Sequence, residues 1–134
     1  MMKRAPLIAL VGALALTPDL AWSGQKNTTN VIVRIEVEAR NAWGALGGAR
    51  NSPDTQQYIG CSLWSSSGTA APWGMCRAQT EAGVNATCLF NNKPAFEKIV
   101  GFMSSDSWVY FHWDANGWCT NIQVENWSTY EPKQ

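Results

Sequence analysis

Four cysteines constrain this chain more than any other feature of its sequence: Cys61, Cys76, Cys88 and Cys119. A metal site is not expected, because no Cys-x-x-Cys pair is present and the single histidine, His112, cannot complete a usual zinc set. An even number of cysteines in an exported chain predicts two disulfides. Three pairings are possible, and the expected strand order favours Cys61–Cys76 together with Cys88–Cys119.

An N-terminal leader indicates that the chain is exported. Basic residues open it, an apolar run follows over residues 5–16, and Ala21 and Ser23 supply the small residues of a cleavage site. The apolar run is shorter than the roughly 20 residues of a transmembrane helix, so no membrane anchor is expected after cleavage. We expect a signal peptide over 1–23, bacterial in style, and a single secreted or periplasmic domain over 24–134.

The charge balance argues against nucleic acid as a partner. Lysine and arginine together number 10, aspartate and glutamate also number 10, and the basic residues form no cluster. Binding to a phosphate backbone would need clustered Lys and Arg. No cofactor motif is present, so we expect neither nucleic acid nor a cofactor, and the oligomeric state stays open.

Alternation of apolar and polar residues predicts a mainly β fold, an antiparallel sheet or small sandwich of about six strands. The expected strands cover residues 31–39, 58–64, 75–80, 84–90, 107–113 and 119–125. Loops are expected over 41–55 and 65–74, which are rich in Gly, Ser or Pro. One short helix is expected near 93–103, with Asn92 as its cap and Pro94 in its first turn.

The C-terminal hairpin has the clearest local pattern. The dipeptide Asn116-Gly117 predicts a type I′ turn between the last strands, and a four-residue loop over 114–117 is the alternative. The two-residue turn pairs Phe111 with Ile122; the longer loop shifts the pairs, but both loops keep these residues on the core side and place Cys119 on the other side. A disulfide from that other side would bring a second segment over it, so we expect the aromatic side of the hairpin to be partly covered.

Catalytic chemistry finds little support. A nucleophile–histidine site would have to be built around His112, and the nearby Ser104, Ser105 and Ser107 lie in no G-x-S-x-G motif. A glycosidase would need a pair of carboxylates, and nothing singles out a pair. The carboxylates considered are Glu36, Glu38, Asp106, Asp114 and Glu125. We therefore expect no catalytic residue, and the sequence favours a non-enzymatic role without deciding the question.

Tryptophan is unusually frequent, with eight in the chain, one of them in the expected leader. Aromatic rings bind sugars and protein surfaces, and loop-borne rings favour that interpretation. The alternative is that a small domain uses tryptophan to fill its core. The candidate binding residues are Trp43, Trp64, Trp73, Trp108, Tyr110 and His112.

Several stretches together resemble a group of small secreted bacterial proteins with four cysteines and an aromatic C-terminal hairpin. They cover residues 57–61, 105–114, 117–120 and 128–133. The resemblance implies a structural pattern, in which a cysteine lies in a strand and another follows the hairpin turn. It implies no activity, ligand or catalytic residue.

The leading hypothesis is a non-catalytic binding module whose ligand is a glycan or a protein surface. One alternative is a small secreted enzyme. Another is a protease or hydrolase inhibitor that acts through the loop over 65–74. A third is a structural protein of the envelope or matrix.

Overall fold

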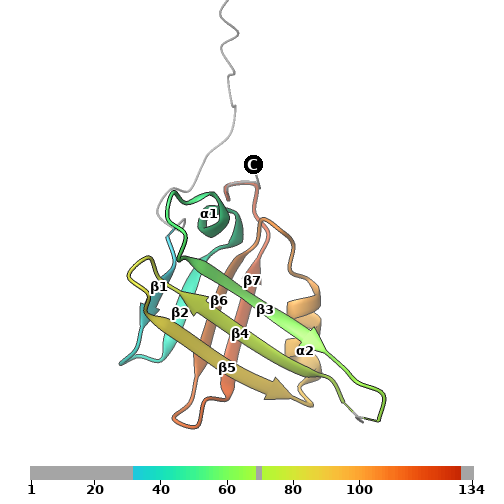
Figure 1. The fold of residues 1–134 in the computed structure, drawn as a ribbon. Coiled ribbons are helices and arrows are strands. Elements are labelled where there is room, and N and C mark those ends of the chain that lie inside the picture. The colour runs from blue at the N-terminus through green and yellow to red at the C-terminus, as the bar shows by residue number, and fades with distance from the viewer. Residues whose placement is uncertain (1–31, 69–70, 131–134) are drawn as a thin grey trace, which may run out of the picture.

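Two antiparallel sheets stacked face to face form the part of the chain that the structure describes, residues 32–68 and 71–130 (Figure 1). The structure is a computed structural model. Seven strands and two helices lie in these residues, so the predicted mainly β fold is confirmed. Neither of these helices is long and apolar enough to cross a membrane. The expected signal peptide lies outside the described residues.

The four-stranded sheet has the order β1-β2-β6-β7. Its strands are β1 (Arg34–Glu36), β2 (Asn41–Ala45), β6 (Trp108–Trp113) and β7 (Cys119–Glu125). The three-stranded sheet has the order β3-β4-β5, with β3 (Tyr58–Trp64), β4 (Trp73–Gln79) and β5 (Asn85–Asn91). In Figure 1 the three-stranded sheet crosses in front of the four-stranded sheet. The core lies between the two.

The strand expected over 31–39 is wrong beyond Glu36. The chain reverses there, and the Arg40 N–H donates to the Val37 carbonyl at 3.1 Å while Arg40 takes a φ of +53°. Val33 is buried as the alternation predicts, but Val37 is 60% exposed. The apolar alternation therefore runs past the point at which the chain turns into its next strand.

The loop expected over 41–55 is also wrong, because this segment forms β2 and then helix α1 (Leu46–Asn51). β2 is a central strand, between β1 and β6, and its neighbours leave little room for side chains. A Cβ added to Gly44 would lie 3.2 Å from the Cα of Val33, and Ala42 is fully buried. Small residues suit this position although their intrinsic preference for strands is low, so tertiary packing decides the element.

Helix α2 (Pro94–Gly101) confirms the helix expected near 93–103. Its first-turn proline is in a position where a missing N–H is tolerated. The expected cap is wrong: Asn92 takes a φ of +47°, and Lys93 stands at the N-cap without a side-chain capping bond. The helix therefore depends on the packing of its apolar side, with Val100 buried in the core.

The core has one especially tight contact between neighbouring strands of the three-stranded sheet. Phe90 on β5 lies opposite Gly74 on β4 in the strand register. Phe90 is 1% exposed, and a Cβ added to Gly74 would lie 2.0 Å from the Phe90 Cζ. The glycine thus makes room for the ring.

The hairpin of β6 and β7 confirms the expected pairing of Phe111 with Ile122. Its turn is not type I′, because that turn needs positive φ at both Asn116 and Gly117. Only Gly117 has a positive φ in this turn, +81°, and its N–H donates to the Asp114 carbonyl at 3.1 Å.

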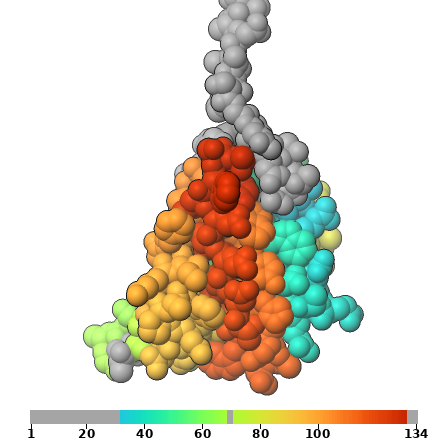
Figure 2. Space-filling view, turned by 180° about the vertical axis from the view of Figure 1, so that it is seen from behind, coloured from blue at the N-terminus to red at the C-terminus, as the bar shows by residue number. Residues whose placement is uncertain are grey.

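A bulge in β7 overturns the expected side of Cys119. His112 pairs with Asn121, whereas Trp113 pairs with Cys119, so Thr120 is an extra residue in the strand. One extra residue reverses the alternation, and Cys119 faces the core at 5% exposure. Its bridge runs inward, so this disulfide does not bring a segment over the outer side, although Trp108 and Tyr110 on that side are half-buried. Figure 2 shows the four-stranded sheet from that side, with α2 next to β7.

Both favoured disulfides are present, which confirms the predicted pairing. Cys61–Cys76 joins β3 to β4, and Cys88–Cys119 joins β5 to β7. The second bridge therefore ties the two sheets together. The two disulfides indicate that the protein works in an oxidising environment.

Candidate binding site

The six candidate binding residues lie on two opposite outer surfaces and do not form one site. Trp64 and Trp73 lie on the outer face of the three-stranded sheet, because their strand neighbours point inward. The other four lie on the outer face of the four-stranded sheet: Trp43, Trp108, Tyr110 and His112. The core separates the two groups, so one small ligand cannot contact both.

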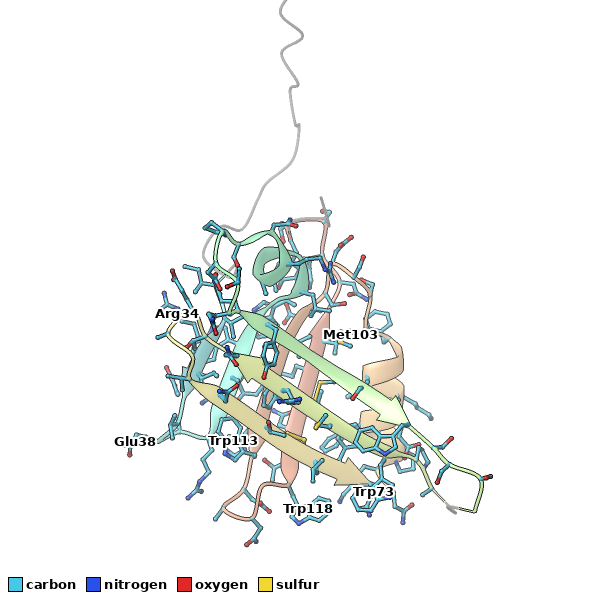
Figure 3. All side chains as sticks on the ribbon, in the orientation of Figure 1. Arg34, Glu38, Trp73, Met103, Trp113 and Trp118 are labelled. Carbon is cyan, nitrogen blue, oxygen red and sulfur yellow. A yellow bond between two sulfur atoms is a disulfide. The ribbon has the colours of Figure 1, made fainter. Side chains whose placement is uncertain are left out.

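The outer face of the three-stranded sheet carries an exposed aromatic patch, which we call the tryptophan face: Trp64, Trp73, Met75, Leu89 and Trp118. Trp64 lies opposite Trp73, and Met75 lies opposite Leu89. Trp64 is 44% exposed, Trp118 40% and Leu89 36%. The ring centroids of Trp73 and Trp118 are 6.2 Å apart (Figure 3). Large exposed apolar side chains that gather in this way are typical of contact surfaces, so this face is the candidate binding site.

Trp118 belongs to this face although it is not among the sequence-based candidates. The Asp114 carboxylate accepts hydrogen bonds from the Asn116 N–H at 2.8 Å and from the Trp118 N–H at 3.0 Å. Leu89 forms a parallel bridge with Trp118. Both bridged residues adjoin the half-cystines that link β5 to β7. The predicted disulfide was therefore the signal that could have placed Trp118 beside β5.

A groove of about 470 Å³ runs beside Trp118 at one end of the tryptophan face. Its polar lining residues are Asn91, Lys93, Asp114 and Thr120. Asp114 uses Oδ1 for the turn, and no described residue donates a hydrogen bond to its Oδ2. The groove thus combines an aromatic ring with side chains that can donate and accept hydrogen bonds.

The aromatic residues of the opposite surface are packed against one another. The rings of Trp108 and Tyr110 stack with centroids 6.4 Å apart and an interplanar angle of 16°. Trp43 lies opposite Tyr110 in the register, and all three are half-buried. These rings are thus less exposed to a ligand than Trp64 and Trp118 on the tryptophan face.

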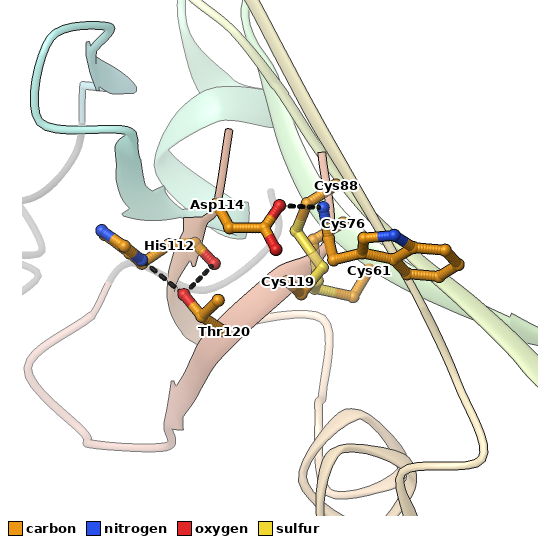
Figure 4. Close-up of a disulfide and its surroundings, with 8 residues drawn as sticks. Cys61, Cys76, Cys88, His112, Asp114, Cys119 and Thr120 are labelled. Atoms are coloured by element: carbon orange, nitrogen blue, oxygen red, sulfur yellow. Dashed lines mark hydrogen bonds between the residues drawn. A yellow bond between two sulfur atoms is a disulfide. The ribbon is translucent and has the colours of Figure 1, made fainter. Parts of the chain in front are cut away.

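His112 has Thr120 as its side-chain partner among the described residues. The His112 Nδ1 and the Thr120 hydroxyl share a hydrogen bond, and the same hydroxyl donates to the His112 carbonyl at 3.3 Å (Figure 4). Ser104 and Ser107 hydrogen-bond to Asn126 instead. The structure therefore brings none of these groups together as a nucleophile and base.

The carboxylates considered for glycoside chemistry are spread over the fold. Asp114 lines the groove beside Trp118, while Glu125 lines a separate groove of about 450 Å³ and accepts a hydrogen bond from the Tyr130 hydroxyl at 2.7 Å. Glu36 and Glu38 are exposed near the β1–β2 turn. Retaining and inverting glycosidases need two carboxylates across one bond, and this arrangement does not supply them.

Asp54, a carboxyl group with a lowered pKa, lies away from both aromatic surfaces. Asp54 accepts hydrogen bonds from the side chains of Gln57 and Ser52 at 2.5 and 2.7 Å, and from the Gln56 and Gln57 N–H groups at 2.7 Å each. These bonds hold the pKa of Asp54 well below its usual range, and the bond from the Gln57 side chain contributes most. Gln57 in turn accepts the Val33 N–H at 2.9 Å, so the cluster fastens a loop to the residue that precedes β1.

Comparison of the chain with protein-family models, with curated proteins and with solved structures gave no match.

Proposed function

We propose that this chain is a non-catalytic binding module that holds a glycan on the tryptophan face. The observation that carries the proposal is the pair Trp73 and Trp118 beside a groove that also presents Lys93, Asn91 and Asp114. The ligand would lie along the groove, with a sugar ring against Trp118.

The mixture of groups favours a saccharide over a wholly apolar ligand. An aromatic ring removes the C–H face of a sugar from water, and polar groups placed beside it hydrogen-bond to the hydroxyls at the sugar's edge. Lys93 can donate to hydroxyl oxygens, and the Oδ2 of Asp114 can accept from a hydroxyl. A flat apolar protein hot spot would need fewer such groups around its rings.

The site is preorganised, which reduces the entropy lost on binding. The Trp118 N–H is held by Asp114, and the Leu89 N–H donates to the Gly117 carbonyl at 3.0 Å. The Cys88–Cys119 bridge lies beside these bonds and fixes β7 against β5. Trp118 therefore presents its ring from a fixed backbone.

The cellular location forms part of the proposal. The two disulfides support function outside the cytoplasm, and the leader expected over 1–23 would deliver the chain to the periplasm or the exterior of a bacterium. An enzymatic role has less support, because His112 bonds to Thr120. The inhibitor hypothesis depends on a loop that includes residues 69–70, which are outside the described residues.

The test is a glycan array followed by a tryptophan fluorescence titration of the disulfide-bonded protein. Trp118→Ala should weaken binding of the best glycan by about tenfold or more, equivalent to about 1.4 kcal/mol. Trp127→Ala is the matched control, because Trp127 is 65% exposed and lies outside the tryptophan face. The control should bind as the wild type does.

Two results would overturn the assignment. One is the absence of glycan binding at millimolar concentrations. The other is a Trp118→Ala variant that is folded, by near-ultraviolet circular dichroism, and binds with unchanged affinity. If the protein captures a protein partner and Trp118→Ala abolishes that capture, the tryptophan face remains the binding site but its ligand is a protein and not a glycan.

A further inference from the structure

The two disulfides meet at one place in the core. Cys61, Cys76 and Cys88 form one row across β3, β4 and β5, because Cys61 pairs with Cys76 and Cys76 pairs with Cys88. The sulfur atoms of Cys76, Cys88 and Cys119 all lie within 4.8 Å of one another. Cys76 is thus bonded to Cys61 but lies beside the other bridge, as Figure 4 shows.

The four half-cystines differ in their access to solvent. Cys76 and Cys88 are fully buried and Cys119 is 5% exposed, whereas Cys61 is only half-buried. Cys61 lies on β3, an edge strand, and lines an open groove of about 350 Å³ together with Met75 and Arg77. A thiolate that approaches from solvent therefore reaches Cys61 before the other three.

We propose that Cys61 is a capture site for thiols and that its reaction shifts the disulfide pairing inside the protein. An external thiolate attacks the Cys61 sulfur, the Cys61–Cys76 bond breaks, and a mixed disulfide forms on Cys61. Cys76 leaves as a thiolate. It then attacks Cys88, which forms Cys76–Cys88 and releases Cys119 as a thiolate that takes up a proton. The number of disulfide bonds is unchanged, so no oxidant or reductant is consumed.

The strand register favours Cys88 as the point of attack. Cys88 lies directly opposite Cys76 on β5, just as Cys61 lies opposite Cys76 on β3. A bridge between directly paired residues already exists on one side of Cys76, with a Cα–Cα distance of 4.0 Å. The equivalent bridge to Cys88 can form with the strands in place.

The exchange would remove the covalent tie between the two sheets. The present Cys88–Cys119 bridge joins them, whereas a Cys76–Cys88 bridge would lie within the three-stranded sheet. Cys119 directly follows Trp118, so its release would loosen one edge of the tryptophan face. The chemistry itself does not depend on the proposed glycan function, and its test has a separate readout.

The wild-type experiment incubates the oxidised full chain with increasing glutathione at pH 8, followed by acid quench, alkylation of free thiols and peptide mapping by mass spectrometry. We expect glutathione on Cys61, an alkylated Cys119 and a Cys76–Cys88 bridge in the same molecules. A Cys76–Cys119 bridge with alkylated Cys88 would also support the exchange. First reaction at Cys88 or Cys119, or alkylated Cys76 beside an intact Cys88–Cys119 bridge, would overturn it.

A pair of variants isolates the internal step. Cys61→Ser leaves Cys76 as an odd thiol inside the three-sulfur group, so a fraction of molecules should carry Cys76–Cys88 and a free Cys119. Cys76→Ser is the matched control: it leaves Cys61 odd, and the Cys61 sulfur is outside that group. We expect at least tenfold more alkylation of Cys119 in Cys61→Ser. Equal alkylation of Cys119 in the two variants would overturn the proposal. If either variant fails to fold, the glutathione experiment on the wild type still tests it.

Discussion

At the scale of single residues, Gly74 lies where the core leaves no room for a side chain. The Phe90 ring occupies the space that a Cβ would take, 2.0 Å from the Phe90 Cζ. The ring cannot withdraw easily, because it packs edge-on against Phe96 with centroids 5.6 Å apart. A glycine that looks like a loop residue in the sequence is therefore a packing requirement of β4.

Gly74→Ala should lower the free energy of unfolding by about 2–3 kcal/mol, because overpacking forces Phe90 or the strand to shift. Urea unfolding of the oxidised protein measures the change. Gly60→Ala is the control on the neighbouring strand, where nothing lies within 4 Å of an added Cβ. Equal destabilisation by the two substitutions would contradict this account of the core.

Asp54 should give the protein an acid-sensitive component of stability. Its folded-state pKa is below the ordinary value of 3.8, so the unfolded state binds the proton more readily. The stabilisation is therefore fully present above about pH 4 and is lost as the pH falls through the lowered pKa. Asp54→Asn should be less stable at pH 7 and should show a shallower loss of stability below pH 4.

The measurement for Asp54 is a series of urea unfolding curves from pH 7 to pH 2. Glu38→Gln is the control, because this exposed side chain lies in the turn between β1 and β2. Its acid slope should match that of the wild type. An Asp54→Asn variant with the full wild-type slope would show that the hydrogen bonds around Asp54 do not carry the effect.

At the scale of elements, the β6–β7 hairpin shows how one inserted residue changes a surface. Phe111 and Ile122 keep the predicted pairing, while Thr120 enters as an extra residue and sends Cys119 into the core. The turn also differs from its prediction, since Asn116 does not take the positive φ of a type I′ turn.

The two possible turns predict different substitution effects. Gly117→Ala should cost about 1 kcal/mol of stability, because an alanine is disfavoured at a φ of +81°. Asn116→Ala should change stability by less than about 0.5 kcal/mol, since its φ is negative and its N–H still donates to Asp114. Thermal and urea unfolding of both variants decide the matter. A comparable cost at Asn116 would support the type I′ turn instead.

At the scale of the whole molecule, the two disulfides have different roles. Cys61–Cys76 closes a 15-residue separation within one sheet, whereas Cys88–Cys119 closes a 31-residue separation between the sheets. The longer loop restricts the unfolded chain more. The second bridge also orients the segment that carries Trp118.

Replacing Cys88 and Cys119 together with Ala should therefore lower stability by about 4 kcal/mol, against about 3 kcal/mol for the Cys61 and Cys76 pair. Only the first double variant should also weaken ligand binding on the tryptophan face. Denaturant unfolding and the fluorescence titration give the two readouts. A larger binding loss in the Cys61 and Cys76 pair would contradict the assigned roles.

The sequence by itself determined the features that depend on local periodicity and on counting. The strand segments predicted through Cys61, Cys76 and Cys88 match β3, β4 and β5, the apolar pattern predicted the final hairpin, and the spacing of apolar residues predicted α2. The even number of cysteines and the strand layout predicted both bridges, Cys61–Cys76 and Cys88–Cys119. These features follow from side-chain patterns that repeat with the period of the element.

Tertiary structure alone decided the features that depend on which surfaces meet. β2 exists because a narrow space between β1 and β6 accepts small residues such as Ala42 and Gly44, which carry no strand pattern of their own. The bulge at Thr120 turned Cys119 inward, since a single insertion reverses the alternation. The stacking of two sheets then divided the candidate aromatic residues between opposite faces and joined Trp118 to Trp73, because distance in space is set by packing and not by position along the chain.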